Sequence, residues 1–433
     1  MKQDRISQII GLLLLVVLSP NLSGQEQTPI AKQFSKEVQK AVKNKKIVKA
    51  FEIVDADDPK TIENLIQLTE TPAPPFGEEK RGLLFKRMLE EAGADKVWVD
   101  EVGNVLALRK GKSGTRKVVL DAHLDTVFPL ETDVKVKVKG DTLMAPGIGD
   151  DTRGLSMVHA VLSAMNQAEI VTDADLYFVG SVGEEGLGDL RGVKHLFRKD
   201  SDLKIDSWIS IDGGSDGRVN TGALGSKRYR ANFKGRGGHS WGAFGLANPH
   251  HALGKAIEYF SKAASEYTSE GAKTSFNIGR LGGGTSVNSI PFESWFEVDM
   301  RSLDPARLLV IDSIFRASVE QAVADYNNSG VDDVVTLDLE PIGDRPSGRL
   351  SADLPLIQRA MAATDEFGIK PRLTTGSTNS NIPISLGIPA VTLGRGGQGR
   401  NAHSLDEWWV NRAGARAIKL ALLVTVLEAG LAE

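Results

Sequence analysis

The sequence of 433 residues contains no cysteine. This absence excludes disulfides, thiolate metal sites, iron–sulfur clusters and a cysteine nucleophile. Any metal ion must therefore be bound by His, Asp or Glu side chains. The chain also lacks an excess of charge of one sign, because 52 basic residues stand against 56 acidic ones. This balance argues against a nucleic-acid partner, which usually requires a strongly basic face.

A phosphate-binding loop is missing as well. The glycine run 282–284 is followed by Thr285 and Ser286 rather than by a lysine. With 41% apolar and 25% charged residues, the chain is globular rather than disordered. Its length is typical of two or three domains.

The first residues have the pattern of a secretory leader. Lys2 and Arg5 precede an apolar run over 9–18, and small residues follow at 23–24. The run is shorter than the roughly 20 residues of a transmembrane helix. We therefore expect a signal peptide over 1–24, no stable membrane insertion after its cleavage, and a periplasmic or secreted protein. A retained membrane anchor is the alternative.

Seven lysines lie between positions 32 and 49, with apolar residues between them at helical spacing. This pattern predicts an N-terminal helix with a solvated basic face. Contact of this helix with an anionic membrane is the alternative.

Short apolar or β-rich runs alternate with helical patterns along most of the chain, which is typical of an α/β sheet. We predict buried, largely parallel strands at 118–122, 176–182, 208–211 and 390–393, and helices at 60–69, 79–92, 154–168, 352–367 and 412–429. The fold class is therefore a mixed, largely parallel sheet that is covered by helices.

The segment 226–342 follows a different pattern. It predicts a β-α-β-β-α-β order, which forms a separate α+β unit of ferredoxin-like type. The predicted elements are strands at 229–234, 274–281, 294–302 and 334–339 and helices at 249–267 and 305–326. We therefore expect one domain over 25–225 plus 343–433, interrupted by an inserted domain over 226–342.

Histidine and acidic residues follow four of the predicted strands. They are His123 and Asp125, Glu184 and Glu185, Asp212, and His403. Ligands of open α/β sheets bind just outside the carboxyl ends of the strands, so we expect these side chains to gather at one edge. A loop with Asp150 and Asp151 precedes the helix at 154–168, and one carboxylate can face the site while the other caps the helix. Two His and several carboxylates suit two zinc, cobalt or manganese ions better than one.

The paired glutamates allow separate roles, because one can bind metal while its neighbour takes a proton from an attacking water. Asp125 lies two residues beyond His123, where it can accept the second ring N–H of that imidazole. The remaining histidines fall in predicted helices or caps, and we interpret them as structural. They are His159, His195, His250 and His251.

These motifs occur in the order found in a family of two-metal exopeptidases and deacylases (clan MH), which the chain resembles over about 60–433. The family includes tripeptide aminopeptidase (peptidase T), glutamate carboxypeptidase, aminoacylase and succinyl-diaminopimelate desuccinylase. The resemblance implies a phosphorylase/hydrolase-like catalytic domain and a homodimer through the inserted domain. It also implies that His123 and Asp212 bind one metal, Glu185 and His403 bind the other, Asp150 bridges them, Glu184 is the general base, and Asp125 orients His123.

Three residues of the inserted domain resemble family positions that contact substrate. His239 would reach across the dimer to the substrate of the partner. Asn288 would lie near the substrate carbonyl, and Arg301 near a substrate carboxylate, which an arginine can bind with two hydrogen bonds. The family often has an acidic residue where this chain has Asn379. We therefore expect this position to lack the negative charge that would bind a free substrate amine.

The resemblance implies a zinc-dependent exopeptidase that hydrolyses short peptides, similar to tripeptide aminopeptidase. One alternative is an N-acyl amino acid deacylase with the same two-metal site. Another is a catalytically silent scaffold that binds peptides. Asp rather than Glu at position 212 resembles the aminopeptidase branch of the family. The presence of Glu184 argues against a catalytically silent protein.

Overall fold

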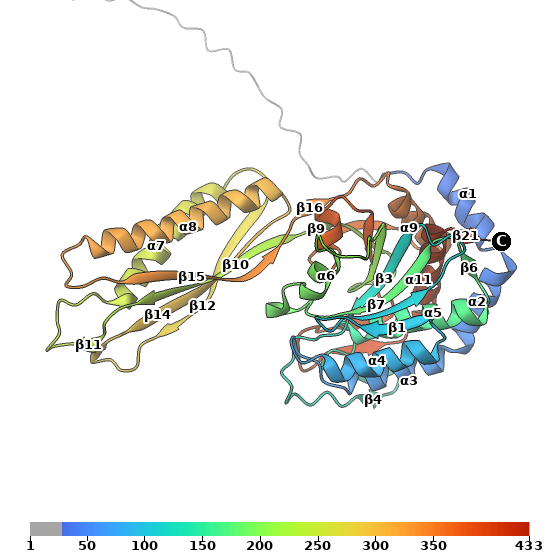
Figure 1. Cartoon of the computed structure of the whole chain (residues 1–433), viewed down its shortest axis with the longest axis horizontal. Helices are drawn as coiled ribbons and strands as arrows, with labels where there is room; N and C mark the ends of the chain where they lie inside the picture. Colours follow the sequence, from blue (N-terminus) through green and yellow to red (C-terminus); the bar gives the residue numbers. More distant parts are fainter. Residues whose placement is uncertain (1–27, 433) are drawn as a thin grey trace, which may run out of the picture.

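A nine-stranded sheet forms the centre of the larger of two domains (Figure 1). The computed structural model describes residues 28–432, so the predicted signal peptide lies outside the described part. The strand order is β1-β2-β7-β3-β8-β18-β9-β16, and β17 also pairs with β9. These strands are β1 (Lys96–Val99), β2 (Val105–Arg109), β3 (Lys117–His123), β7 (Asp175–Ser181), β8 (Ser207–Ile211), β9 (Arg218–Ala223), β16 (Gly348–Arg349), β17 (Arg372–Gly376) and β18 (Ala390–Leu393).

The middle of this sheet is parallel. β7, β3, β8 and β18 run in one direction, whereas β1, β2 and β16 are antiparallel to the strands beside them. All of β8 and nearly all of β3 are buried, which is expected of central parallel strands. The predicted fold class is confirmed, although β7 ends at Ser181, one residue before the predicted end.

Helices pack against this sheet and against one another. They are α1 (Lys32–Ala41), α2 (Lys45–Ala56), α3 (Asp58–Thr69), α4 (Glu79–Glu91), α5 (Thr152–Gln167), α6 (Arg191–Leu196), α9 (Pro355–Glu366), α10 (Asn381–Ser385) and α11 (Gly414–Ala429). α5 and α11 contact β3 and β8, α4 contacts β1 and β2, and α9 contacts β9 and β18. Nearly all of α11 is buried, because it lies between the sheet and other helices, and its sequence is accordingly mostly apolar, with Arg416 and Lys419 half-buried in its first turns.

The basic segment 32–49 belongs to two helices rather than one. The side chain of Asn44 accepts hydrogen bonds from the amides of Lys46 and Ile47 at 2.9 and 3.4 Å, and so it caps a new helix. The prediction of a single helix is therefore wrong. All seven lysines of the segment are exposed.

A separate four-stranded sheet was not expected from the sequence. Its order is β19-β20-β5-β4. The strands are β19 (Gln398–Arg400), β20 (Trp408–Val410), β5 (Thr142–Met144) and β4 (Lys137–Lys139). β5 leads into the loop with Asp150, and β20 follows His403. This sheet therefore brings together two loops that are far apart in the sequence.

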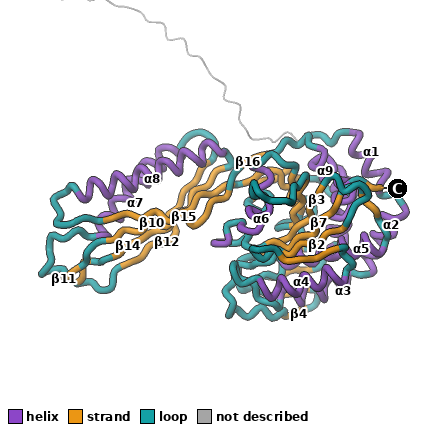
Figure 2. The backbone as a smooth tube through the Cα atoms, viewed as in Figure 1, coloured by secondary structure: helices purple, strands orange, loops and turns teal. Residues whose placement is uncertain are grey.

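The inserted segment forms the second, elongated domain (Figures 1 and 2). It consists of β10 (Gly225–Lys234), α7 (Pro249–Thr268), β12 (Thr274–Gly283), β14 (Glu293–Ser302), α8 (Pro305–Asn327) and β15 (Thr336–Arg345). The antiparallel sheet has the order β12-β14-β10-β15, and α7 and α8 pack on it. Its core is separate from that of the larger domain and contains Phe233, Phe260, Phe296 and Phe315. A short pair at the far end, β11 (Gly238–His239) with β13 (Ser289–Ile290), carries the loop that follows His239.

The C-terminal residues rejoin the larger domain through a pair of short strands, β6 (Val171–Thr172) with β21 (Leu431–Ala432). Within residues 28–432, no helix has both the length and the apolar character that a membrane crossing requires.

The four histidines that the sequence predicts to be structural have polar or aromatic partners. Nδ1 of His159 lies 3.3 Å from Asn64, Nε2 of His195 lies 2.8 Å from Glu101, and Nδ1 of His250 lies 2.8 Å from Ser294. His251 packs edge-on against Tyr326.

We predict that His159 destabilises the folded protein at acidic pH. The pKa of His159 is lowered to about 4 from an ordinary value of 6.5, mainly by burial and to a smaller extent by the charge of Lys60. The unfolded chain therefore binds more protons between these values, and stability that is present above pH 6.5 is lost as the pH falls towards 4. The loss amounts to about 3 kcal/mol. The drop in urea midpoint between about pH 7 and about pH 4.5 should be larger for wild type than for His159→Gln. Equal drops would contradict this prediction.

Candidate metal centre

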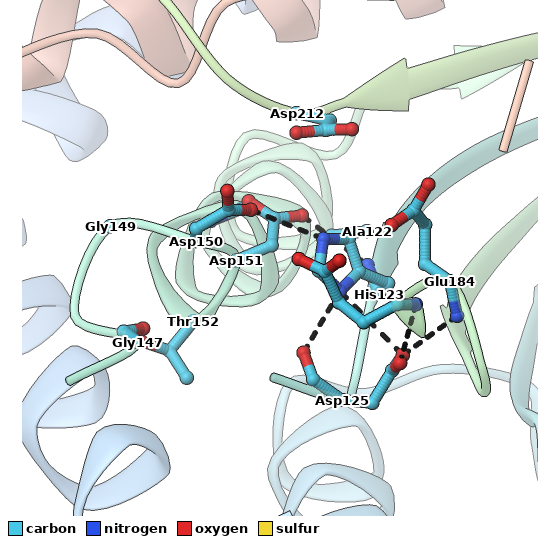
Figure 3. A network of polar contacts seen from close by, with 12 residues as sticks. Ala122, His123, Asp125, Gly147, Gly149, Asp150, Asp151, Thr152, Glu184 and Asp212 are labelled. Atoms are coloured by element: carbon cyan, nitrogen blue, oxygen red, sulfur yellow. Dashed lines mark hydrogen bonds and ion pairs between the residues drawn. The ribbon is translucent and has the colours of Figure 1, made fainter. Parts of the chain in front are cut away.

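The carboxyl ends of the parallel strands meet at one edge of the central sheet. His123 is the last residue of β3, Glu184 and Glu185 follow β7, and Asp212 follows β8. Figure 3 shows His123, Glu184 and Asp212 in one network with Asp150, which comes from the loop before α5. The structure therefore gathers side chains that the sequence places on separate elements.

Asp150 lies between two imidazoles. One carboxylate oxygen, Oδ1, is 3.3 Å from Nε2 of His123, and the other, Oδ2, is 3.5 Å from Nε2 of His403. Nε2 of His403 is also 2.8 Å from Oε1 of Glu185. The two oxygens of Asp150 thus face two different donor groups, as a bridging carboxylate requires.

Asp125 contributes in two ways, and neither is the predicted hydrogen bond between its carboxylate and His123. Nδ1 of His123 lies 2.9 Å from the backbone carbonyl of Asp125 but 3.6 Å from its carboxylate. The carbonyl therefore fixes the imidazole and leaves Nε2 directed at Asp150. The carboxylate instead accepts hydrogen bonds from the amides of Glu184 and Glu185 at 2.9 and 2.7 Å. It orients the glutamate pair more directly than it orients His123.

Asp151, the second aspartate of the loop, caps α5. Its carboxylate accepts a hydrogen bond from the amide of Gly154 at 3.2 Å and one from the amide of His123 at 3.3 Å. One aspartate thus faces the cluster while the other caps the helix, as the sequence pattern predicts.

Neighbouring charges make both imidazoles favour a positive charge. Burial opposes the protonation of His123, but the carboxylates of Asp125 and Asp150 raise its pKa well above the usual value. Hydrogen bonds to Asp150 and Glu185 raise the pKa of His403 to about 10. An environment of this kind attracts cations.

The donor set fits divalent metal ions. Ligand atoms of His123, Asp150 and Glu185 lie within 4.8 Å of one another, and the same is true of Asp150, Asp151 and Asp212. Asp150 belongs to both groups, so an ion can be held on each side of it. Imidazole and carboxylate ligands suit zinc, cobalt and manganese, and cysteine is not required.

Glu184 lies beside the cluster, in a cavity of about 540 Å³ between the two domains. Its carboxylate accepts a hydrogen bond from Nη1 of Arg345 at 2.9 Å, and both side chains are about 6% exposed. Burial raises the pKa of Glu184 well above its ordinary value, while Arg345 opposes the shift. Arg345 was not identified from the sequence, because it ends a strand of the inserted domain and reaches Glu184 only in the folded chain.

The inserted domain places its three predicted substrate residues in different locations. Arg301 lines the cavity and donates a hydrogen bond to Asp299 at 2.6 Å. His239 and Asn288 lie at the far end of the domain, near β11 in Figure 1. Nδ1 of His239 accepts hydrogen bonds from the amides of Trp241 and Gly242. The structure therefore does not bring His239 or Asn288 to the metal cluster of the same chain.

Asn379 does not line the cavity, which corrects the expectation that it bears on a substrate amine. Its side chain is 3% exposed and donates hydrogen bonds to Asp121 at 2.8 Å and to Ser181 at 2.7 Å. Burial raises the pKa of Asp121 to about 6, and hydrogen bonds from Ser210, Ser181 and Asn379 oppose the shift. Asn379 thus belongs to a buried polar network beneath the cluster.

Two further residues of the site were missed. The buried carboxylate of Glu407 accepts hydrogen bonds from the loop before α5, and Nη1 of Arg395 lies 3.2 Å from Oδ1 of Asp150. The sequence offered one indication of Glu407, which is an acidic residue directly before Trp408 and Trp409.

Residues 119–425 match the model of the peptidase family M20/M25/M40. The chain belongs to this family. Enzymes of the M20 family use a dimetal site and hydrolyse amide bonds, so this protein is an amide hydrolase.

Relatives of the chain include the uncharacterized protein YqjE of Bacillus subtilis, which is 24% identical over 78% of this chain and 91% of its own length. Among solved structures, aminopeptidase PepT of Bacillus cereus has a TM-score of 0.65 and 19% identity, covering 85% of this chain and 98% of that one. The dipeptidase Dug1p of Saccharomyces cerevisiae has a TM-score of 0.67 and 16% identity, covering 88% and 98%. These likenesses show that the M20 fold extends over nearly all of the described chain.

We predict that His403→Ala lowers the metal content of the protein by about one ion. Nε2 of His403 lies 3.5 Å from Oδ2 of Asp150, whereas Nε2 of His123 lies 3.3 Å from Oδ1, so removal of His403 leaves the His123 side of Asp150 intact. Metal content after dialysis, measured by plasma mass spectrometry, checks this outcome. The control is His195→Ala, because His195 pairs with Glu101 outside the cluster. A His403→Ala protein with the metal content of wild type would remove His403 from the ligand set.

Proposed function

We propose that the protein is a zinc-dependent exopeptidase that hydrolyses short peptides, with Glu184 as its general base. The position of Glu184 carries this proposal. Its side chain lies in the wall of the inter-domain cavity, directly beside the two groups of metal-ligating residues, yet it belongs to neither group. A carboxylate in this position can exchange a proton with a water or an amine at the cluster.

In this proposal, residues of the cavity and one residue of a partner subunit share the steps of hydrolysis. When bound, two divalent ions supply Lewis acidity for the scissile carbonyl and lower the pKa of the attacking water. Glu184 accepts a proton from this water and passes it to the nitrogen of the leaving amine. Arg345 holds one oxygen of Glu184, which leaves the other for the proton transfer. His239 of the partner subunit stabilises the negative charge that develops on the carbonyl oxygen.

Arginines favour a substrate that carries a carboxylate. Arg228 and Arg301 line the cavity on the inserted-domain side, and Asp299 accepts hydrogen bonds from both at 2.8 and 2.6 Å. Arg301 can bind a terminal carboxylate. A cavity of about 540 Å³ suits a short peptide rather than a folded chain.

A second cavity favours an N-acyl amino acid deacylase as the alternative. It has a volume of about 980 Å³ and lies beside the metal loop, with Arg395, Arg400 and Trp408 in its wall. Among the described residues of this wall, the one acidic side chain is Glu407. Its carboxylate already accepts hydrogen bonds from backbone amides. This cavity therefore has no carboxylate available for a free substrate amine, whereas a neutral or acidic acyl group would encounter no repulsion.

We predict that Glu184→Gln keeps its metal but hydrolyses peptides at least roughly 100-fold more slowly, because the amide cannot accept a proton. The substrates are matched pairs of di- and tripeptides with a free or an acylated amine, and the protein is metal-stripped and then refilled with zinc, cobalt or manganese. Glu101→Gln is the control, since Glu101 is exposed and lies outside the cavity.

Cleavage of free-amine peptides alone would support the exopeptidase, and cleavage of acylated substrates alone would support the deacylase. A wild-type protein that holds two ions but cleaves neither would contradict both. Unchanged turnover by Glu184→Gln would exclude Glu184 as the general base.

A homodimer through residues 226–342 completes the proposed site. Trp241, Phe244 and Val287 are 87%, 88% and 103% exposed beside His239, and such apolar exposure is typical of a surface that another molecule covers. The leader pattern at 1–24 supports export to the periplasm or the medium.

We predict that two inactive variants, Glu184→Gln and His239→Ala, regain activity when mixed. In a mixed dimer, one site combines Glu184 of one copy with His239 of the other, so exchange of subunits should restore about a quarter of wild-type activity. Turnover before and after exchange, together with the mass in solution, checks this outcome. No recovery in a protein shown to exchange subunits would mean that His239 does not act across the dimer.

A further inference from the structure

We propose that Glu407 is a positioning residue for the metal centre, because it holds the loop that carries Asp150 in the conformation needed to bind metal. This inference rests on the metal site of the proposed function. Glu407 lies outside both groups of potential ligands. Its effect on metal is therefore exerted through the backbone of the loop.

The carboxylate of Glu407 accepts hydrogen bonds from three backbone amides of this loop. Oε2 accepts a hydrogen bond from the amide of Gly147 at 2.7 Å, and Oε1 accepts one from Gly149 and one from Asp150, both at 3.0 Å. The side chain is 2% exposed. Asp150 is thus fixed at its own backbone amide, directly beside the carboxylate that faces His123 and His403.

Only an acceptor suits this position. An ionised carboxylate offers two oxygens and no donor, whereas the amide of a glutamine offers one oxygen and an NH₂ group. In a Glu407→Gln variant, that NH₂ group would face at least one backbone N–H of the loop. A loop amide left without an acceptor in this buried site would shift the loop.

The loop also approaches Glu407 closely. A Cβ atom added at Gly149 would lie 2.9 Å from Oε1 of Glu407 and 3.5 Å from the guanidinium carbon of Arg395. Gly149 does not have a positive φ angle, so the backbone itself tolerates alanine. Gly149→Ala therefore perturbs the same contact from the loop side without changing any charge.

The four-stranded sheet explains why Glu407 can connect two ligand loops. β20 pairs with β5, with Trp408 opposite Met144, and the amide of Ala145 donates to the carbonyl of Glu407 at 3.1 Å. His403 lies four residues before Glu407 in the same segment. The segment that supplies one ligand, His403, thus also fixes the loop that supplies Asp150.

The test uses full-length protein loaded with cobalt, whose absorption spectrum reports the ligand geometry and whose dissociation constant reports affinity. We expect Glu407→Gln to bind cobalt about tenfold or more weakly, with an altered spectrum, because loss of a group that orients a ligand typically has this effect. The control is Asp406→Asn, since the neighbouring Asp406 is exposed and has no contact with the loop amides. It should bind cobalt as wild type does.

Gly149→Ala should change the spectrum in the same way. The double variant should bind cobalt no more weakly than the weaker single variant, because both changes disrupt one contact. If Glu407→Gln does not fold in the metal-free state, Gly149→Ala decides alone, and a wild-type spectrum in that variant overturns the proposal.

The proposal is also overturned if Glu407→Gln lowers the melting temperature but keeps the cobalt spectrum and affinity of wild type. Glu407 would then have a structural role only. Because metal binding is measured without substrate, this result leaves the proposed function intact. A wild-type protein that binds no cobalt would instead overturn the metal site, and the proposed function with it.

Discussion

The burial of several carboxylates at one edge of the central sheet is the constraint on which the rest of the structure depends. Taking ionised groups out of water is costly unless opposite charges and hydrogen bonds compensate. Here two imidazoles flank Asp150, Arg395 lies beside it, and Arg345 binds Glu184. The negative charge that these positive groups do not neutralise makes this edge suited to divalent cations.

The architecture keeps these charges at fixed distances. Parallel strands deliver His123, the glutamate pair and Asp212 to one edge, and loops joined to the four-stranded sheet deliver Asp150 and His403. The inserted domain contributes Arg345 at the end of β15, one of the two connections between the domains. The inserted domain thus contacts the proposed general base directly, through Arg345.

The sequence predicted most of the fold because its signals are local. Apolar runs located the central strands, and the rule that ligands gather at strand ends located His123 and Asp212. The contributions of Glu407 and Arg345 could not be predicted, because they depend on the pairing of segments far apart in the sequence. The prediction that Asn379 bears on a substrate amine was wrong for a related reason. Its side chain is directed to Asp121 and Ser181, which are distant in the sequence. Asn44 broke a continuous helical pattern through a cap that periodicity alone does not reveal.

Anomalous diffraction from crystals of the zinc-loaded protein tests most directly whether Asp150 bridges two metal ions. We expect two anomalous peaks, one on each side of the Asp150 carboxylate, with His123 and Asp212 at one and Glu185 and His403 at the other. A single peak, or two peaks that do not share Asp150, would contradict a bridging role for Asp150.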